Sequence, residues 1–415
     1  MIRFLHLADV HLDTVFQNRD RQRRALLREA VREAFRAGVD LALSSGCHAF
    51  LIGGDLFDNQ TLSFTTEKFL LTEMERLAQG QVQVFYAAGN HDPSGGKDRV
   101  KQICWPDNVH IFAKGLPDSY PLLHRTGQTI AMIVGAGHEG SRESKNLASL
   151  FPRAQKRDVP YIALLHTLVT GSTGDLEHER YAPCTLPDLK GKGYSYWALG
   201  HVHKREVLSE NPYIVYPGNL MGRNPRETGL KGAYLVEIDD DRQVRMEFYP
   251  LAPLCWYDLT VNNLAEADHL EKLEQLIVST VEEQLENKRE RKMMLRLKLA
   301  GPCPLYRELA AAENLAILEE NLANLLSLEY LELNQEGLLP PLHLERYQQG
   351  PHVLSELLAL LASLESDETT LLQLAPEQLA GCHRNAEPKE KIEYLRTLLQ
   401  GLDDEAVARL VEVEE

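Results

Sequence analysis

Aspartate, asparagine and histidine residues follow a series of apolar segments in this chain, and these residue types bind metal ions. The central example is Asp55, which comes after the apolar run 49–52 and the pair Gly53-Gly54. Such a run predicts a buried parallel strand, and in an open α/β sheet functional residues collect where the strands end. The two glycines allow a tight turn and leave room for a small ligand such as a metal ion. A lone Gly-Gly-Asp is more often a simple turn, so the prediction depends on the other strand ends.

Four further predicted strands lead into residues of the same kinds. The segment 2–8 leads into Asp9-Val10-His11, in which Asp9 and His11 project to the same side of an extended chain. The other three segments lead into metal-binding residue types as well: 83–88 into Gly89-Asn90-His91-Asp92, 159–165 into His166, and 194–199 into Gly200-His201-Val202-His203. A single histidine at a strand end is more often a satisfied core or surface residue than a ligand. Five such strand ends together favour one shared site.

The combined set is large enough for two divalent metal ions, with these candidate ligands: Asp9, His11, Asp55, Asn90, His166, His201 and His203. Asp55 is the predicted bridging ligand, because its two carboxylate oxygens can hold two cations about 3.5–4 Å apart. The mixed oxygen and imidazole ligands suit Mn²⁺, Fe²⁺ or Zn²⁺, of which we expect Mn²⁺. Two adjacent cations lower the pKa of a bound water and neutralise charge on a phosphoryl group, and His91 can donate a proton. The predicted reaction is phosphoester hydrolysis.

The elements that position these residues alternate between strands and helices. Helices are predicted at 21–44 and 65–78, and short strands between 109 and 134 indicate a second sheet. The first half of the helix at 21–44 is rich in arginine, and Arg21, Arg24 and Arg28 are candidate contacts to nucleic acid. Most charge runs of this kind are solvated helix faces, so this alternative stays open.

The composition restricts the class of protein. A length of 415 residues predicts two or three domains. The net charge of −17 argues against a free-standing nonspecific DNA binder, because such a protein needs a positive surface; a local basic patch or a partner would have to supply it. The six cysteines form no Cys-x-x-Cys pair, and no apolar segment approaches the roughly 18 residues of a membrane span. Without a signal-peptide pattern, we expect a cytoplasmic protein with no membrane contact.

The ordered motifs Asp-x-His, Gly-Asp-x-x-Asp, Gly-Asn-His-Asp, His and Gly-His-x-His resemble those of the calcineurin-like metallophosphoesterase superfamily over residues 2–250. Within it, the segments 6–12, 54–58 and 216–219 are similar to SbcD-type DNA repair exonucleases, with the YhaO-like branch nearest. Two residues depart from the pattern: Asp13 stands where many members have glycine, and Asn219 where SbcD itself tends to have serine. Neither departure removes a candidate ligand.

The resemblance implies an α/β fold: a four-layer metallophosphoesterase sandwich of two mixed sheets flanked by helices. It implies one metal ion held by Asp9, His11, Asp55 and His203, and a second held by Asp55, Asn90, His166 and His201. It also implies that His91 donates a proton to the leaving oxygen or stabilises the transition state, and that Asp92 orients His91.

Beyond residue 253 the sequence pattern changes. Strands at 256–261, 292–299 and 328–333, with helices at 270–285 and 305–326, predict a small α/β unit. The segment 337–341 predicts a linker, followed by leucine-rich helices at 353–364, 371–379 and 389–413. The predicted domains are therefore 1–252, a metallophosphoesterase nuclease domain; 253–336, a cap; and 337–415, a helical region that could dock a partner.

In SbcD-like nucleases such a cap helps to position DNA, and C-terminal helices dock on an SMC-like ATPase. A cap that only adds stability and leucine stripes that form an intramolecular core stay open as alternatives. The resemblance therefore implies a two-metal DNA exonuclease or endonuclease, the nuclease subunit of an SbcCD-like repair complex with an SbcC-type partner.

Two other functions compete with this one. One is a phosphodiesterase or phosphatase that acts on a nucleotide or phosphoprotein, and the other is a non-catalytic scaffold, which would require lost ligands where none is lost. The sequence leaves open whether the chain forms a homodimer.

Overall fold

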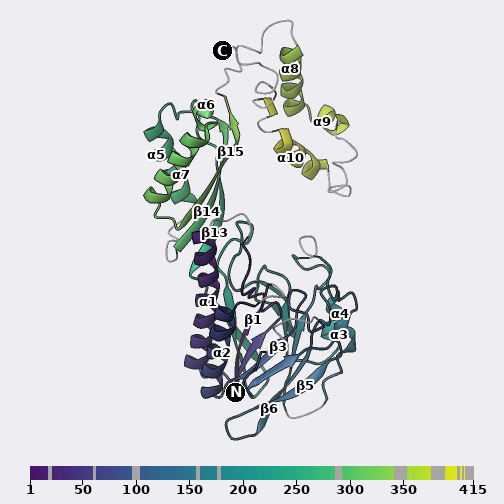
Figure 1. Cartoon of the computed structure of the whole chain (residues 1–415). Helices are drawn as coiled ribbons and strands as arrows, with labels where there is room; N and C mark the ends of the chain where they lie inside the picture. Colours follow the sequence, from purple (N-terminus) through teal and green to yellow (C-terminus); the bar gives the residue numbers. More distant parts are fainter. Residues whose placement is uncertain are drawn as a thin grey trace. The chain divides into compact units, whose positions relative to one another are not determined.

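The computed structural model describes residues 1–16, 21–58, 62–95, 103–155, 159–174, 179–285, 292–340, 353–374, 388–399, 402–403 and 406 (Figure 1). The chain divides into two compact units, Met1–Tyr257 and Asp258–Glu415. None of the described helices is long and apolar enough to cross a membrane.

The first unit contains two mixed six-stranded sheets. The first sheet has the order β12-β11-β1-β2-β3-β4, in which β1 to β4 are parallel and β11 is antiparallel to both of its neighbours. Its strands are β1 (Ile2–Leu7), β2 (Ala49–Ile52), β3 (Gln83–Ala87), β4 (Val109–Phe112), β11 (Gly232–Ile238) and β12 (Val244–Pro250). All four residues of β2 are buried, as expected for a strand covered on both faces.

The second sheet has the order β5-β6-β7-β8-β10-β9. The strands β6, β7, β8 and β10 are parallel, and antiparallel strands lie at both edges. The strands are β5 (Asp118–Leu123), β6 (Thr129–Ala136), β7 (Tyr161–His166), β8 (Tyr196–Gly200), β9 (Glu206–Glu210) and β10 (Tyr213–Tyr216).

Apolar side chains from both sheets share one core, so the sheets pack face to face. Phe4, Leu51 and Phe85 of the first sheet belong to the same buried cluster as Ile162 and Tyr196 of the second. The outer face of the second sheet is covered by α3 (Leu147–Leu150) and α4 (Leu186–Lys190).

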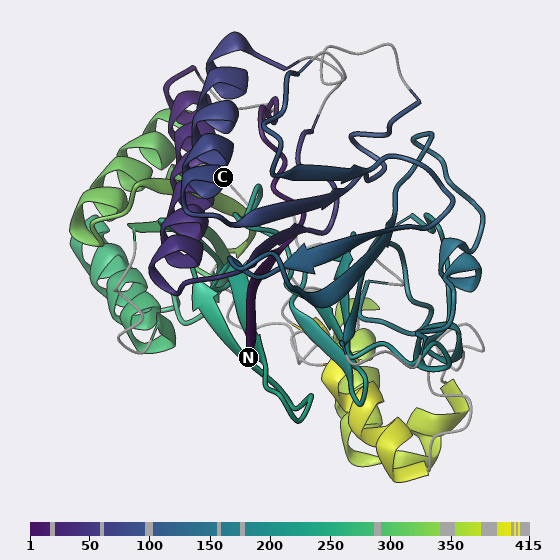
Figure 2. The ribbon, with the colours of Figure 1, turned by 90° about the horizontal axis from the view of Figure 1, so that it is seen from below.

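Two long helices, α1 (Arg21–Ser44) and α2 (Phe64–Gln79), lie side by side along the first sheet (Figures 1 and 2). The buried face of α1 repeats at helical spacing through Leu27, Val31, Ala34 and Phe35, and the Phe35 ring lies 5.7 Å from that of Phe50 on β2. These layers confirm the expected sandwich of two mixed sheets flanked by helices.

The second unit contains a three-stranded sheet in the order β13-β14-β15 and two groups of helices. Its elements are the part of β13 (Leu254–Val261) from Asp258 onward, α5 (Leu270–Leu285), β14 (Lys292–Pro302), α6 (Tyr306–Leu309), α7 (Ala312–Leu325), β15 (Tyr330–Leu339), α8 (Val353–Ser366), α9 (Glu368–Leu374) and α10 (Pro388–Leu399). The helices α8, α9 and α10 share a small core built by Leu364, Leu371, Ile392 and Leu395.

Two expectations for this unit are wrong. The predicted linker at 337–341 is a strand through residue 339, because its backbone continues the parallel pairing of β15 with β14 beyond a register shift. The predicted helix at 305–326 is two helices, since Ala311 has an extended backbone between them. Residue 341 and the predicted helical segments 375–379, 400–401, 404–405 and 407–413 lie outside the described residues. The domain boundaries after 252 and 336 stay predictions.

Candidate metal centre

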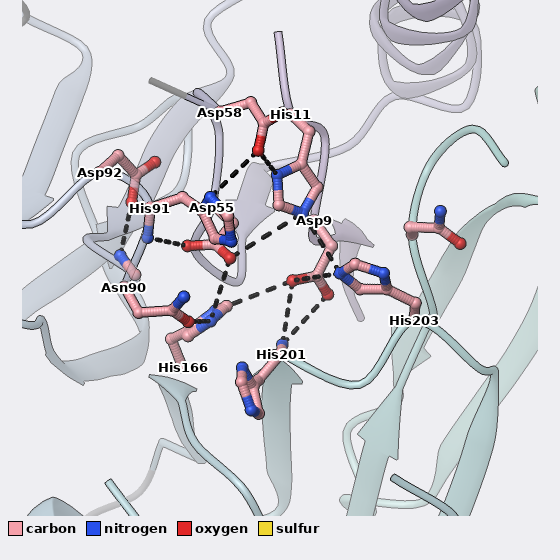
Figure 3. A network of polar contacts seen from close by, with 12 residues as sticks. Asp9, His11, Asp55, Asp58, Asn90, His91, Asp92, His166, His201 and His203 are labelled. Carbon is pink, nitrogen blue, oxygen red and sulfur yellow. Dashed lines mark hydrogen bonds and ion pairs between the residues drawn. The ribbon is translucent and has the colours of Figure 1, made fainter. Parts of the chain in front are cut away.

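The candidate ligands lie together because the strands that carry them end at one edge of the two sheets (Figure 3). Parallel pairing of β1, β2 and β3 brings the loops after them side by side, and β7 and β8 are parallel in the facing sheet. Backbone hydrogen bonds continue past the strands: the amide of Asp9 donates to the Gly54 carbonyl, and the amide of His11 to the Asp55 carbonyl. Strand register therefore sets the spacing of the side chains.

Three groups of potential ligand atoms lie within 4.8 Å of one another among the described residues. Two groups consist of candidate ligands, namely Asp9, His11 and His203 in one and Asp9, Asp55 and His166 in the other, and the third consists of His11, Asp58 and His91. The Asp55 Oδ2 atom lies 3.4 Å from His166 Nε2 and 3.9 Å from His11 Nε2, while Asp9 belongs to both groups. The bridging role of Asp55 stays a prediction.

The hydrogen bonds of the histidines indicate which ring nitrogen carries the proton and which carries the lone pair. The Nδ1 atoms of His11 and His203 lie 3.1 and 2.9 Å from carboxylate oxygens of Asp58 and Glu227. An ionised carboxylate only accepts, so the Nδ1 of His11 carries the proton and its Nε2 carries a lone pair. The Nδ1 of His203 also lies 3.3 Å from the donor Arg223 Nη2, but the shorter contact to Glu227 at 2.9 Å favours the same tautomer for His203. The two Nε2 atoms lie 3.2 Å apart. Two lone pairs at this distance repel each other, whereas a cation bound by both would make the arrangement favourable.

His166 shows the same pattern on the other side of Asp55. Its Nδ1 donates to the Gly53 carbonyl at 2.8 Å, which leaves the lone pair of Nε2 facing Asn90 Oδ1 at 2.9 Å. Two acceptors face each other here as well. The donor set therefore fits a pair of divalent cations on geometry alone.

The charges of the site lead to the same conclusion. Burial raises the pKa of Asp9 to about 7, and burial together with Asp92 raises the pKa of Asp55 well above its usual value. Burial lowers the pKa values of His11 and His166, so both rings stay neutral. Among the described residues, no lysine or arginine forms an ion pair with Asp9 or Asp55. Buried carboxylates without a cation are costly, and bound metal ions would supply the missing positive charge.

The backbone at the candidate ligands is strained. Asp9, His11, Asp55 and His201 have φ angles of 51°, 52°, 49° and 107°. Non-glycine residues rarely adopt positive φ, and each such residue costs on the order of 1–3 kcal/mol. Strain at four of seven candidate ligands is typical of a functional site held in place by its surroundings.

Two glycines allow the loops to approach this closely. Gly54 has a φ of 96°, and a Cβ atom built on it would lie 2.3 Å from His166 Nδ1. A Cβ atom on Gly89 would lie 2.1 Å from Asp55 Oδ1. Both loops would have to move if a larger residue stood at either position.

His91 differs from the candidate ligands because its side chain is 41% exposed. Its Nδ1 lies 3.0 Å from Asp58 Oδ1, and this hydrogen bond raises the pKa of His91 to about 9. The carboxylate of Asp92 accepts hydrogen bonds from the backbone amides of Leu56, Phe57 and Gly89, and its role in orienting the His91 ring stays a prediction. Asp92 therefore joins the loops after β2 and β3, while Asp58 holds the His91 ring.

Comparisons with known proteins agree with this geometry. Residues 2–205 match the family model described as calcineurin-like phosphoesterase. The chain is 34% identical over 308 residues to the "Uncharacterized metallophosphoesterase YhaO" of Bacillus subtilis, which covers 73% of this chain and 72% of the relative. The chain belongs to the calcineurin-like phosphoesterase family.

More distant relatives of this phosphoesterase carry the name "DNA double-strand break repair protein Mre11". The Mre11 protein of Sulfolobus acidocaldarius is 22% identical over 316 residues, which cover 74% of this chain and 77% of the relative. The Mre11 protein of Methanopyrus kandleri is 26% identical over 270 residues, which cover 60% of this chain and 56% of the relative. The family and the two ligand groups suggest a dimetal site.

Three residues outside the predicted set of site residues, Glu227, Arg223 and Asp58, support the phosphoesterase site. Glu227 holds His203 Nδ1 with Oε1, and its Oε2 accepts from Asn219 Nδ2 and from the Arg223 amide, both at 2.7 Å. Arg223 reaches Asp58 Oδ1 at 3.3 Å. Burial by itself would raise the pKa values of the Asp58 and Glu227 carboxyl groups. The hydrogen bonds that they accept outweigh burial and keep both pKa values below their usual values. Of these three residues, only Asp58 belongs to a sequence motif, as the second aspartate of Gly-Asp-x-x-Asp.

Two candidate ligands occupy positions beside the two groups. The ring of His201 lies 5.1 Å from that of His166, and its Nε2 donates to the Glu179 carbonyl. The His201 amide donates to both oxygens of Asp9 at 3.1 Å. Asn90 reaches the site through the contact of its Oδ1 with His166. The roles of all seven residues as ligands stay predictions.

The three candidate arginines of α1 have different surroundings. Arg21 is exposed and Arg24 is half-buried, whereas the guanidinium of Arg28 donates to the Thr14 carbonyl at 2.9 Å. Farther along the helix, Arg32 pairs with Glu29, and Arg36 with Glu73. A substrate contact by Arg21, Arg24 or Arg28 stays a prediction. Other arginines of this basic run, and Arg28 itself, form hydrogen bonds or ion pairs within the protein.

Proposed function

We propose that this phosphoesterase is a two-metal-dependent DNA nuclease that hydrolyses phosphodiester bonds. The observation that carries the proposal is the position of Asp58, whose one oxygen holds both the candidate ligand His11 and the exposed ring of His91. This arrangement places a proton-bearing group beside two sets of ligand atoms, as phosphoester hydrolysis requires. The similarity to Mre11 proteins of double-strand break repair supports DNA as the substrate.

The proposed ligands are divided between two cations. Asp9, His11, Asp55 and His203 would hold one, and Asp55, Asn90, His166 and His201 would hold the other. The oxygen and imidazole donors fit Mn²⁺, with Fe²⁺ and Zn²⁺ as the nearest competitors. When bound, the metal ions would polarise the phosphoryl group and lower the pKa of a water molecule.

The chain's own residues have separate tasks in this proposal. His91 donates a proton to the leaving oxygen from Nε2, because Asp58 occupies its Nδ1. Asp92 fixes the loop that carries His91 through its three backbone contacts. Asp58 and Glu227 hold the rings of His11 and His203 so that each Nε2 faces the site.

The test is Mn²⁺-dependent cleavage of labelled linear DNA by the full chain, beside hydrolysis of bis-p-nitrophenyl phosphate. We expect both activities in the unaltered chain and neither in His91→Ala. The matched control is His124→Ala, since His124 is exposed in the turn between β5 and β6. Near-normal cleavage by His91→Ala would show that the assigned proton donor is wrong.

A second candidate function is hydrolysis of a nucleotide or phosphoprotein ester, which the net charge of −17 favours. The same experiment separates the two candidates. Hydrolysis of the small ester with no cleavage of DNA, even with an SbcC-type ATPase present, would support the small-ester phosphodiesterase or phosphatase.

We also propose an SMC-like, SbcC-type ATPase as the partner, which would supply positive surface for DNA. Apolar side chains on the helices α8 and α10 support this proposal, because Val353, Leu360 and Leu398 are 77%, 46% and 41% exposed. Co-purification of the chain with the ATPase should be lost in the double variant Val353→Glu, Leu360→Glu. Retained binding would place the contact elsewhere, and sedimentation of the chain alone would test for a homodimer.

A further inference from the structure

A cavity of about 620 Å³ opens beside the candidate ligand His203. It is lined by His203 and by six residues from the loops before β9 and β11: Lys204, Asn224, Arg226, Glu227, Thr228 and Lys231. Ligand pockets typically measure on the order of 300–1,000 Å³, so the cavity has room for more than a single phosphate group. It adjoins the metal centre directly, because His203 Nε2 faces His11 while the same residue lines the cavity.

The lining is positive although the chain as a whole is acidic. Lys204, Arg226 and Lys231 contribute three cations against the single carboxylate of Glu227. That carboxylate is already used, since it accepts hydrogen bonds from His203, Asn219 and Arg223. Within the described part of the chain, neither Lys204 nor Arg226 forms an ion pair through its side chain. The cavity therefore offers uncompensated positive charge.

Lys231 differs from an ordinary surface lysine. Its residue surface is only 9% exposed, and its ammonium group donates one hydrogen bond, to the His203 carbonyl at 2.9 Å. An ammonium group has three donors, and no other hydrogen bond of this group occurs among the described residues. A buried donor of this kind favours an anionic partner in the cavity that it lines.

The wall of the cavity is held in a fixed shape. The fully buried ring of Trp256 donates to the Gly222 carbonyl at 3.0 Å, and its backbone carbonyl accepts from the Gly229 amide at 3.2 Å. Asn224 accepts from the Arg226 amide at 2.9 Å. A loop held by several hydrogen bonds loses little conformational entropy when a ligand binds.

We propose that this cavity binds the phosphate next to the scissile one in a polynucleotide strand. The inference rests on the proposed nuclease function. It means that a good substrate of the metal centre has two consecutive phosphates. One phosphate lies at the metal centre, and the strand continues over His203 into the cavity, where Lys204, Arg226 and Lys231 contact the second phosphate. A small ester with a single phosphate has no second phosphate to place against these residues.

The test compares two substrates: a single-stranded oligodeoxynucleotide and the 5′-p-nitrophenyl phosphate ester of thymidine, which has one phosphate. We expect Lys204→Glu and Arg226→Glu to lower the ratio of the two kcat/KM values, oligonucleotide over ester, at least tenfold. Each lost phosphate contact should also reduce the slope of log(kcat/KM) against log[salt] by about 0.7 for single strands. Arg125→Glu is the matched control, because it lies in the turn before β6, at the opposite end of the sheet.

The outcomes separate this inference from the function on which it rests. A ratio and salt slope unchanged in both charge-reversal variants would overturn the second-phosphate site and leave the nuclease proposal standing. Cleavage of the thymidine ester with no cleavage of the oligonucleotide would overturn both this site and DNA as the substrate. Cleavage of neither substrate by the unaltered chain would contradict the proposed function itself.

Discussion

Replacing Asp58 by asparagine should weaken the site at two points, because one oxygen of Asp58 holds both His11 and His91. The two contacts are 3.1 and 3.0 Å long, and the Asp58 side chain is only 13% exposed. Asparagine keeps an acceptor of the same shape but removes its charge. A hydrogen bond to a charged group contributes about 1.5–3 kcal/mol and a neutral one about 0.5–1.5 kcal/mol, so each contact should lose about 1 kcal/mol. Each loss corresponds to roughly a fivefold effect.

The two effects appear in different measurements. The weaker hold on His11 should raise the Mn²⁺ concentration needed for half-maximal hydrolysis of bis-p-nitrophenyl phosphate about fivefold. The weaker hold on His91 should lower kcat at saturating Mn²⁺ by a similar factor. Asp58→Ala removes the hydrogen-bond acceptor of both histidines. It should change the half-maximal Mn²⁺ concentration and kcat by 10- to 100-fold, the range typical when a group that orients a metal ligand is lost.

Asp188→Asn provides the control for the loss of a hydrogen-bonded carboxylate. Asp188 lies in α4, where among the described residues it accepts hydrogen bonds from Thr185 and Asn146 and not from a candidate ligand. This variant should change the melting temperature without changing the Mn²⁺ dependence. If Asp58→Asn and Asp58→Ala both kept the metal dependence and kcat of the unaltered chain, Asp58 would not position either histidine, and the argument for the site would fail.

Three further predictions concern the surroundings of the metal centre. Glu227→Gln should weaken activation by Mn²⁺ about tenfold, since the His203 ring loses its charged anchor, and the activation curve measures this. Gly54→Ala should destabilise the fold by roughly 1–3 kcal/mol more than Gly127→Ala in thermal melts. Both glycines have positive φ, but only the Cβ at position 54 meets another atom, and an equal loss in both variants would contradict the steric argument. Mn²⁺ at about 100 times its Kd should stabilise the unit by about 2.7 kcal/mol, or roughly 5–10 °C in melting temperature, and a chelator should reverse the shift.

The sequence predicts the strand ends well because local pattern determines them. The segments 49–52 and 83–88 are apolar and short, and their predicted bounds differ from those of β2 and β3 by at most one residue. The residues after each strand then meet because parallel strands place their carboxyl ends at one edge. The arrangement of two mixed sheets came from the family resemblance, since single strands do not reveal their partners.

The partners of the side chains could not be predicted in the same way. Asp58 and Asp92 are both acidic and both follow candidate ligands, and only the folded loops determine that Asp58 faces His91. Glu227 lies 24 residues from His203 without a distinguishing motif. Residues 337–339 belong to β15 although the glycine and prolines of 337–341 favour a linker, because pairing with β14 overrides that local preference.

The positive φ angles at the candidate ligands mean that this protein is not at its stability optimum. Asp9 combines an unfavourable backbone conformation with a buried carboxylate, and both are costs that only the bound state offsets. Asn tolerates the left-handed conformation and carries no charge, so Asp9→Asn should melt at a higher temperature than the unaltered chain in the presence of a chelator while losing activity. Selection for thermostability alone would therefore favour replacement of Asp9, at the cost of the chemistry that the site performs.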